Sequence, residues 1–295
     1  MHIVIGGASG FLGSALADHL RAEGHQVTRL VRGSATGSST SSWDPVAGRI
    51  DQVLIDRADA AVNLSGSPIS QWPRTQKRAA EILSSRLHAT TTLATAVAKA
   101  ETPPVFLSGS GMSWYGVDRG VVPLPETESP GSGFLADVSQ QWEAAAQPAV
   151  DAGARTCFLR TSLVQDKAGG MLKLMLPAWK LGGGARLGSG DQHMSLISRT
   201  DWVRAVTFLL TADVAGPVNL AAPADVTNAE FTDALGDAVH RPTFLAAPSF
   251  AIRGVLGGLA DDLLGSLRVK PDVLTDAGFE FAAPTLETLL ADALA

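Results

Sequence analysis

The sequence predicts an α/β fold, a doubly wound parallel sheet with a smaller C-terminal lobe. Short β-branched runs alternate with longer helical stretches over the first two-thirds of the chain, and this rhythm changes beyond about residue 169. Such alternation is typical of a parallel sheet with helices on both faces. A chain of 295 residues, 45% of them hydrophobic, can also bury a large core.

The elements of the first part follow in chain order. Residues 2–7 form the first strand, residues 11–24 a helix that Gly24 ends, and residues 26–33 the second strand. The Gly- and Ser-rich stretch 33–42 is expected to be a surface loop. Further strands are predicted at 60–66, 104–110 and 155–164, and helices at 75–100 and 135–150.

The last third is expected to be mostly helical. Residues 181–197 are glycine-rich, Asp201 is predicted to cap a short helix through Leu210, and residues 227–235 open as an N-capped helix. We therefore expect a first domain over residues 1–164, to which a later strand near 218–222 returns. A smaller lobe is expected over residues 165–295.

Composition excludes several classes of protein. A net charge of −6 and scattered basic residues argue against a nucleic-acid binder. The six histidines show no metal-ligand spacing, so no metal is expected. The chain shows neither a signal peptide nor an 18-residue apolar run, which predicts a cytoplasmic protein without a membrane partner. The single cysteine, Cys157, lies in an apolar run and is expected to be a buried thiol rather than a nucleophile.

A glycine pattern between the first strand and the first helix indicates a dinucleotide site. GGASGFLG places Gly7, Gly10 and Gly13 there, with the spacing GxxGxxG. Glycine permits a tight turn, close backbone approach to a pyrophosphate and close packing of helix on strand. The anion then meets free amides and the positive end of the helix dipole. The alternative is a glycine-tolerant turn without a ligand.

The end of the second strand favours NADP(H) over NAD. Selectivity for NAD usually needs an acidic residue there, whereas an arginine accommodates the extra phosphate of NADP. No acid occurs between Glu23 and Asp44, and Arg32 stands at the strand end. The alternative is that Arg32 is a solvated surface residue.

Motifs spread over nearly the whole chain carry a resemblance to a known family. They include VIGGASGFLG, LVRG, AVNLSG, SWYG, GFLADVSQQWEAA and LGGGARLGSGDQ. The chain resembles the extended and atypical short-chain dehydrogenase/reductases, in particular the sugar-epimerase-like group labelled epimerase family protein, the 39U type. The resemblance implies a Rossmann-type domain, an NADP(H) cofactor, a substrate-binding C-terminal lobe and oxidoreductase activity on an unknown small molecule.

The resemblance also assigns residues to the site. Those implied to bind the cofactor are Gly7, Ser9, Gly10, Phe11, Leu12, Gly13, Arg32, Leu64, Ser65, Gly66, Arg86, Ser108, Gly109 and Leu163. Those implied on the substrate side are Trp114, Gln192 and Met194. For Arg86, a helix arginine on a solvated face is an alternative.

The catalytic pair of the superfamily is missing. In the superfamily this pair is a tyrosine followed four residues later by a lysine. The corresponding positions here hold Leu135 and Ser139. A phenol is a poor acid at neutral pH unless a cation shifts its pKa. The sole tyrosine, Tyr115, precedes Arg119 by four residues, but in a stretch that looks like a loop. Tyr115 and Ser110 are the remaining candidate catalytic residues.

Two acids on the predicted helix at 135–150, Asp137 and Glu143, are expected to be solvated; the alternative is that one of them supplies the missing acid. Three functions stay open: an NADP(H)-dependent oxidoreductase with unusual acid–base residues, a non-catalytic NADP(H) sensor or scaffold, and a nucleotide-sugar epimerase. The missing pair weakens the epimerase most. The protein is expected to be a monomer or a homodimer.

Overall fold

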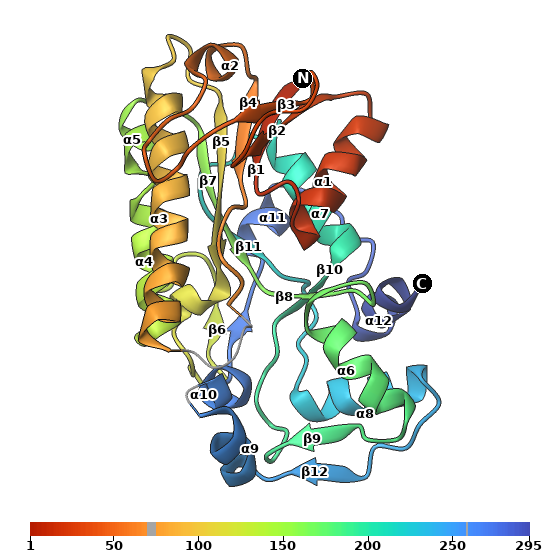
Figure 1. Cartoon of the computed structure of the whole chain (residues 1–295). Coiled ribbons are helices and arrows are strands. Elements are labelled where there is room, and N and C mark those ends of the chain that lie inside the picture. Colours follow the sequence, from red (N-terminus) through yellow and green to blue (C-terminus); the bar gives the residue numbers. More distant parts are fainter. Residues whose placement is uncertain (70–74, 258) are drawn as a thin grey trace. The chain divides into compact units, whose positions relative to one another are not determined.

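The predicted α/β fold is confirmed by a computed structural model, which describes residues 1–69, 75–257 and 259–295. A seven-stranded sheet has the order β11-β7-β5-β4-β1-β2-β3 (Figure 1). β1 pairs in parallel with β2 and β4, β2 with β3, and β4 with β5. The strands are β1 His2–Gly6, β2 Gln26–Val31, β3 Thr40–Ser42, β4 Ala60–Asn63, β5 Val105–Gly111, β7 Thr156–Thr161 and β11 Gly216–Leu220.

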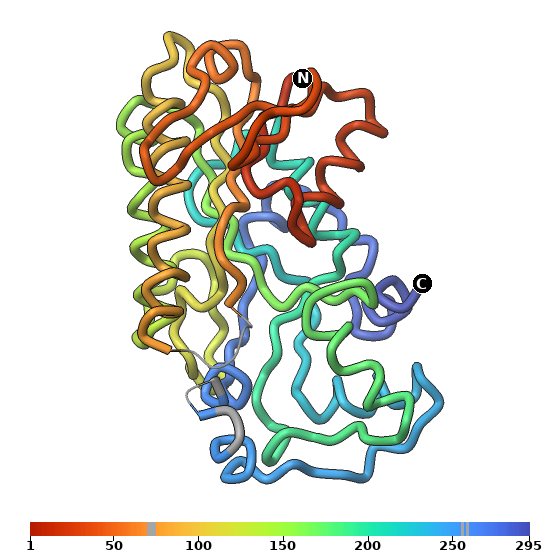
Figure 2. Tube along the Cα trace, in the orientation of Figure 1, coloured from red at the N-terminus to blue at the C-terminus, as the bar shows by residue number. Residues whose placement is uncertain are grey.

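The chain forms two compact units, each built from three stretches of sequence. The first comprises 1–111, 137–160 and 205–218, and the second 112–136, 161–204 and 219–295. These stretches can be followed by colour along the trace in Figure 2. The expected first domain, residues 1–164 with a later strand near 218–222, differs from this division at residues 112–136, which belong to the second unit. Residues 205–218, which include the start of β11, belong to the first unit.

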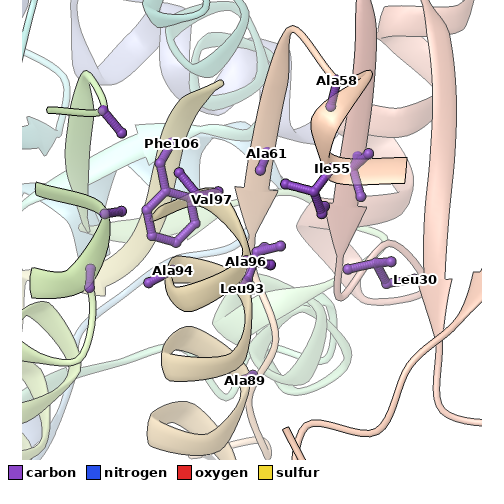
Figure 3. Close-up of a cluster of buried hydrophobic side chains, with 14 of the residues drawn as sticks. Leu30, Ile55, Ala58, Ala61, Ala89, Leu93, Ala94, Ala96, Val97 and Phe106 are labelled. Carbon is purple, nitrogen blue, oxygen red and sulfur yellow. The ribbon is translucent and has the colours of Figure 1, made fainter. Parts of the chain in front are cut away.

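The core of the first unit lies between the sheet and the long helix α3 (Figure 3). Phe106 and Ala61 on the strands face a row of small and branched side chains that includes Leu93, Ala94 and Val97 on α3. Small residues allow a helix to approach a sheet closely. The helices here are α1 Phe11–Ala22, α2 Gln52–Asp56, α3 Gln76–Lys99, α5 Gln147–Asp151 and most of α4 Phe134–Ala144.

The second unit has short paired strands and its own apolar cluster. The rings of Trp179 and Phe231 form a T-shaped pair with their centroids 6.5 Å apart, and Leu172, Leu176 and Leu289 pack in the same cluster. The strands are β6 Pro123–Leu124, β8 Leu163–Gln165, β9 Ala185–Leu187, β10 Leu196–Ser198, β12 Leu245–Ala247 and β13 Arg268–Val269. The helices are η1 Met112–Tyr115, α6 Gly170–Lys180, α8 Asn228–Ala238, α9 Ser249–Leu256, α10 Leu259–Leu264, α11 Asp272–Asp276 and α12 Leu286–Leu294.

The helix α7, Arg199–Leu209, corrects one predicted cap. Asp201 lies within its first turn, and Ser198 supplies the cap, because the Ser198 hydroxyl accepts the Asp201 N–H at 3.1 Å. The Asp201 carboxylate is fully buried and accepts the N–H groups of Ala282 and Ala283, both at 2.8 Å. It also accepts Arg204 Nη1 on its own helix at 2.7 Å, so this carboxylate joins α7 to a distant loop.

Two other segments differ from expectation. The stretch expected to be a loop, 33–42, ends in β3, whose Thr40–Ser42 pairs with β2. The helix expected at 135–150 is two helices, α4 and α5, with Pro148 at the start of the second. Proline has no N–H to continue a helix, which explains the break.

Cys157 is a buried thiol, as expected. Its side chain is fully buried, and Sγ lies 3.1 Å from the Val214 carbonyl, to which it donates. Burial raises the pKa of this thiol to about 11. Within the described ranges, no helix is both long and apolar enough to span a bilayer, and no three His, Cys, Asp or Glu side chains gather as metal ligands.

Candidate functional site

The predicted glycine turn connects β1 to α1, and two of its glycines are required by close packing. Gly7 has φ +80°, and a Cβ there would lie 2.6 Å from the Leu64 carbonyl. A Cβ on Gly13 would lie 2.3 Å from the Gly7 carbonyl oxygen. Only glycine fits at either position, so the backbone of the turn lies tightly against both the helix and the loop after β4.

The N-terminus of α1 is open to an anion. Its N-cap, Gly10, provides no side-chain hydrogen bond, and the first turn holds no acidic residue. Ser9 and Gly10 are exposed, while Phe11 and Leu12 are half-buried at the start of the helix. The free N–H groups of a first helical turn attract phosphate.

Arg32 follows the last residue of β2 and is exposed. Within the residues that the structure describes, its guanidinium forms no ion pair or hydrogen bond. β1 pairs in parallel with β2, so the glycine turn and Arg32 both lie at the carboxyl edge of the sheet. The structure therefore brings these two predicted features to one edge.

The loop after β4 reaches the same edge. Gly6, Asn63 and Ser108 occupy matched positions on β1, β4 and β5. The Asn63 side chain accepts the Ser65 N–H at 3.1 Å and donates to the Thr90 hydroxyl at 2.8 Å. Ser65 Oγ and Ser108 Oγ are buried without a hydrogen-bond partner in the described part of the chain. Two serine hydroxyls thus stay available to a ligand.

Arg86 on α3 is buried, so the alternative of a solvated surface arginine is wrong. Its Nη1 donates to the carbonyls of Ser67 and Ile82, each at 3.0 Å, and its guanidinium lies 4.8 Å from the Trp142 ring centroid. Burial lowers the pKa of Arg86 to about 10. A Cβ on Gly66 would lie 3.0 Å from Arg86 Cζ, so Arg86 packs directly against the loop after β4.

A buried ion pair lies beside the end of β5. Arg160 Nε and Nη2 donate to the two carboxylate oxygens of Glu143 at 2.9 and 3.0 Å, and the two side chains are 4% and 8% exposed. Ser110 Oγ donates to the same Glu143 carboxylate at 2.6 Å. The expectation that Glu143 is solvated is therefore wrong, whereas Asp137 is exposed as expected.

The sequence signal that could have found this pair was weak. Arg160 stands inside an apolar strand, where a charged side chain needs a buried partner. Glu143 lies 17 residues earlier, on a helix, and nothing local links the two. Gly109, between the two predicted serines, is packed as well, since a Cβ there would lie 2.6 Å from Trp142 Cζ2.

Tyr115, in the second unit, is held inside the protein. Its side chain is fully buried, and its hydroxyl lies 2.8 Å from Asn219 Oδ1 and 3.2 Å from the Pro125 carbonyl, with both oxygens as acceptors. Arg119 directs its guanidinium to Glu128 at 3.1 Å. This geometry gives the phenol a structural environment and leaves its predicted catalytic role without support.

The remaining predicted residues also lie in the second unit. Leu163 and Met194 line one pocket of that unit. Gln192 donates from Nε2 to the Leu187 carbonyl at 3.1 Å, and Trp114 packs beside the cluster around Tyr115. Sequence reasoning missed the other methionines of the pocket, whose shared location depends on the fold.

Comparison with known proteins identifies the family. Residues 3–221 match the NAD dependent epimerase/dehydratase family, and residues 247–293 match a domain of unknown function, DUF1731. The first match covers most of the chain, which therefore belongs to the NAD dependent epimerase/dehydratase family.

Within that family, the similar proteins carry the name epimerase family protein. One from Mycobacterium bovis is 43% identical over 288 residues, which cover 96% of this chain and 94% of that protein. Human SDR39U1 is 34% identical over the full length of both proteins. A crystal structure of human SDR39U1 (isoform2) with NADPH is 32% identical, with a TM-score of 0.89 and 99% of both chains covered. The resemblance drawn from the motifs is confirmed.

Proposed function

We propose that this protein binds NADP(H) and acts as an atypical short-chain dehydrogenase/reductase on a small molecule. The observation that carries the proposal is the carboxyl edge of the sheet. There the close-packed glycine turn after β1 leads into the N-terminus of α1, which has no side-chain cap. Arg32, which has no partner among the described residues, follows the adjacent parallel strand β2. The structure of human SDR39U1 with NADPH supports the choice of cofactor.

The residues present fit a dinucleotide. A Cβ at Gly7 or Gly13 would clash with the backbone of Leu64 or of Gly7, so glycine at both positions lets the turn fold tightly between β1 and the start of α1, as a dinucleotide turn requires. Arg32 would hold the adenosine phosphate, and the unpartnered hydroxyls of Ser65 and Ser108 would serve the ribose and the nicotinamide side. The amides of the turn and of the first helical residues would bind the pyrophosphate.

When bound, the cofactor supplies or accepts a hydride, and the protein must manage the accompanying proton. The positions of the usual tyrosine and lysine hold Leu135 and Ser139, both buried on α4. Leucine cannot transfer a proton, and serine carries no cation to shift a phenol. Any proton must therefore pass through another group.

Ser110 is the side chain we propose for contact with the substrate oxygen. Its hydroxyl proton points to Glu143, which Arg160 holds on both carboxylate oxygens. The lone pairs of Ser110 are then free to accept a hydrogen bond, for example from a substrate alcohol. Binding of a carbonyl oxygen would require the hydroxyl to rotate away from Glu143. Tyr115, bonded to Asn219, is assigned to the framework.

A non-catalytic NADP(H) sensor or scaffold is the second candidate. It is favoured by Leu135 and Ser139, which replace the usual catalytic tyrosine and lysine. It needs the same cofactor site and no proton donor. Epimerisation through a keto intermediate is less well supported, because it requires a base at the reacting oxygen and the pair that usually provides it is absent.

Thermal unfolding with each dinucleotide tests cofactor choice. A ligand that binds only the folded state raises the melting temperature by mass action. We expect NADPH to stabilise the protein more than NADH. Arg32→Ala should weaken NADPH binding about tenfold or more, because a charge-assisted contact is lost, and should leave NADH binding unchanged. Arg57 is a matched control: it is exposed, without a partner in the described residues, and precedes β4 at the opposite edge. Equal stabilisation by NADH and NADPH would refute the choice of NADP(H).

Turnover separates the two candidates. NADPH oxidation is measured against a panel of carbonyl compounds with the wild type, Ser110→Ala and Tyr115→Phe. Under the oxidoreductase proposal, Ser110→Ala loses turnover and Tyr115→Phe retains it, while both still bind NADPH. Stabilisation by NADPH without oxidation of any panel member would favour the sensor.

A further inference from the structure

Four of the five methionines of this protein line one pocket in the second unit. They are Met112, Met171, Met175 and Met194, whereas Met1 begins the chain in the first unit. Leucines complete much of the remaining wall. Methionine side chains are unbranched and polarisable, adapt their shape to a ligand, and contact aromatic rings favourably.

Two polar side chains in the wall, those of Asn228 and Ser195, are hydrogen-bonded within the protein, whereas His193 Nδ1 is buried without a hydrogen-bond partner in the described part of the chain. Asn228 accepts the Leu187 N–H at 2.8 Å and donates to Met194 Sδ at 3.4 Å. Ser195 Oγ donates to the Leu267 carbonyl at 2.7 Å and accepts the Val269 N–H at 2.8 Å. Neither group requires a polar partner from a ligand.

The charge of the wall disfavours anions. Among the described residues that line the pocket, none is an arginine or a lysine, and the one carboxylate is Asp262. His193, also in the wall, has Nδ1 3.5 Å from Asp225, which pairs with Arg268 as well. A phosphate or a carboxylate in this pocket would lose its hydration without gaining a cation.

The size of the pocket limits the ligand further. Its volume is about 70 Å³, whereas pockets that enclose a whole ligand usually measure about 300–1,000 Å³. The pocket therefore suits one ring or one branched alkyl group, and the rest of the ligand would lie outside it. The methionine side chains can change rotamer to fit the group.

The geometry points to a binding site for an uncharged ligand that places a small apolar group among the four methionines. If the substrate of the proposed reaction binds in this pocket, the substrate is an apolar carbonyl compound or alcohol and not a nucleotide sugar. That second step rests on the proposed function, while the preference of the pocket for an uncharged apolar group does not.

Methyl-labelled methionine gives a direct readout, because four of its five signals report on the pocket. The full chain is labelled with [¹³C-methyl]methionine, and the signals are assigned with single Met→Leu variants. Acetophenone, benzoate and UDP-glucose are then titrated without NADPH. We expect acetophenone to shift pocket signals and leave Met1 unmoved, since a nearby ring changes methyl shifts strongly. Benzoate has the same ring with a carboxylate and should bind at least about fivefold more weakly.

Variants on α6 test the contact itself. Met171→Gln places an amide in the apolar wall and should weaken acetophenone binding about tenfold, because the amide loses water on binding. Leu174→Gln is the matched control on the same helix, at a side chain that is 72% exposed and outside the wall. It should leave acetophenone binding unchanged.

The proposal is overturned if acetophenone leaves all four pocket signals unmoved at millimolar concentration, or if benzoate or UDP-glucose shifts them as strongly. Stabilisation by NADPH is measured on the same samples, which separates the two proposals. Absence of stabilisation by NADPH refutes the cofactor proposal alone. Normal stabilisation with unmoved methionine signals refutes the pocket proposal alone.

Discussion

Replacing Arg160 by methionine should destabilise the first unit strongly. The change removes the guanidinium that donates to both oxygens of Glu143, whose side chain is 8% exposed. The carboxylate then keeps the Ser110 hydroxyl as a donor. Removing one partner of a buried ion pair costs about 3–5 kcal/mol, because the other charge stays buried without compensation.

The double variant Glu143→Leu/Arg160→Met distinguishes this cause from lost packing. It leaves no buried charge, and an apolar pair of similar volume is often as stable as the ion pair. Ser110 loses its acceptor in this variant, which costs about 1 kcal/mol. We therefore expect the double variant to be more stable than Arg160→Met alone by about 2 kcal/mol or more.

Cys157 provides the assay, since it lies on β7, the strand that also carries Arg160, and is the protein's only cysteine. Its thiol is buried and has a raised pKa of about 11, so it should react with a thiol reagent only after the first unit opens. Pulse labelling along a urea gradient then gives the free energy of unfolding for that unit. The reasoning is wrong if Arg160→Met costs less than about 1 kcal/mol, or if the two single changes simply add.

Two further predictions concern the glycine turn and one buried acid. Gly13→Ala forces a methyl group onto the Gly7 carbonyl, so it should cost about 1–3 kcal/mol of stability and weaken NADPH binding. Gly254→Ala is the control, because no neighbouring atom lies within 4 Å of the added carbon. If calorimetry shows equal losses of stability for the two variants, the clash at Gly13 is contradicted. Burial raises the pKa of Glu126 above its ordinary value of 4.5 despite three backbone hydrogen bonds that lower it. The folded state therefore binds this proton more tightly, and stability falls as pH rises from about 4.5 through the folded pKa. Glu126→Gln should flatten the dependence of the free energy of unfolding on pH in this range. If urea titrations at several pH values show the same dependence for wild type and variant, the prediction is wrong.

Local sequence patterns were sufficient for the sheet and for the carboxyl edge at which the glycine turn and Arg32 lie. The β-branched runs, the glycine spacing and the arginine after β2 are each contained within a few residues, and parallel pairing places them at one edge. A helix start was predicted correctly at Thr227, which forms a capping box with Glu230, whereas the break near Pro148 was missed within the single helix expected at 135–150.

Long-range partners explain the errors. Glu143 and Asp201 are acids on helices, for which solvent or a local cap is the usual environment. Glu143 nevertheless binds Arg160, and Asp201, besides Arg204 on its own helix, binds the backbone at 282–283. The pocket methionines span residues 112–194, and only Met171 and Met175, four residues apart on α6, have a spacing that places them on one helix face. Such contacts depend on how segments far apart in the chain are packed.

The interleaved path of the chain has a consequence for synthesis on the ribosome. The edge strand β11 pairs next to β7 but is made about 55 residues later, at Gly216–Leu220. Until it emerges, β7 presents unpaired backbone groups, which are a template for pairing with other chains. Neither compact unit corresponds to a continuous gene fragment. A nascent chain halted before residue 216 should therefore depend on a chaperone that shields an open sheet edge.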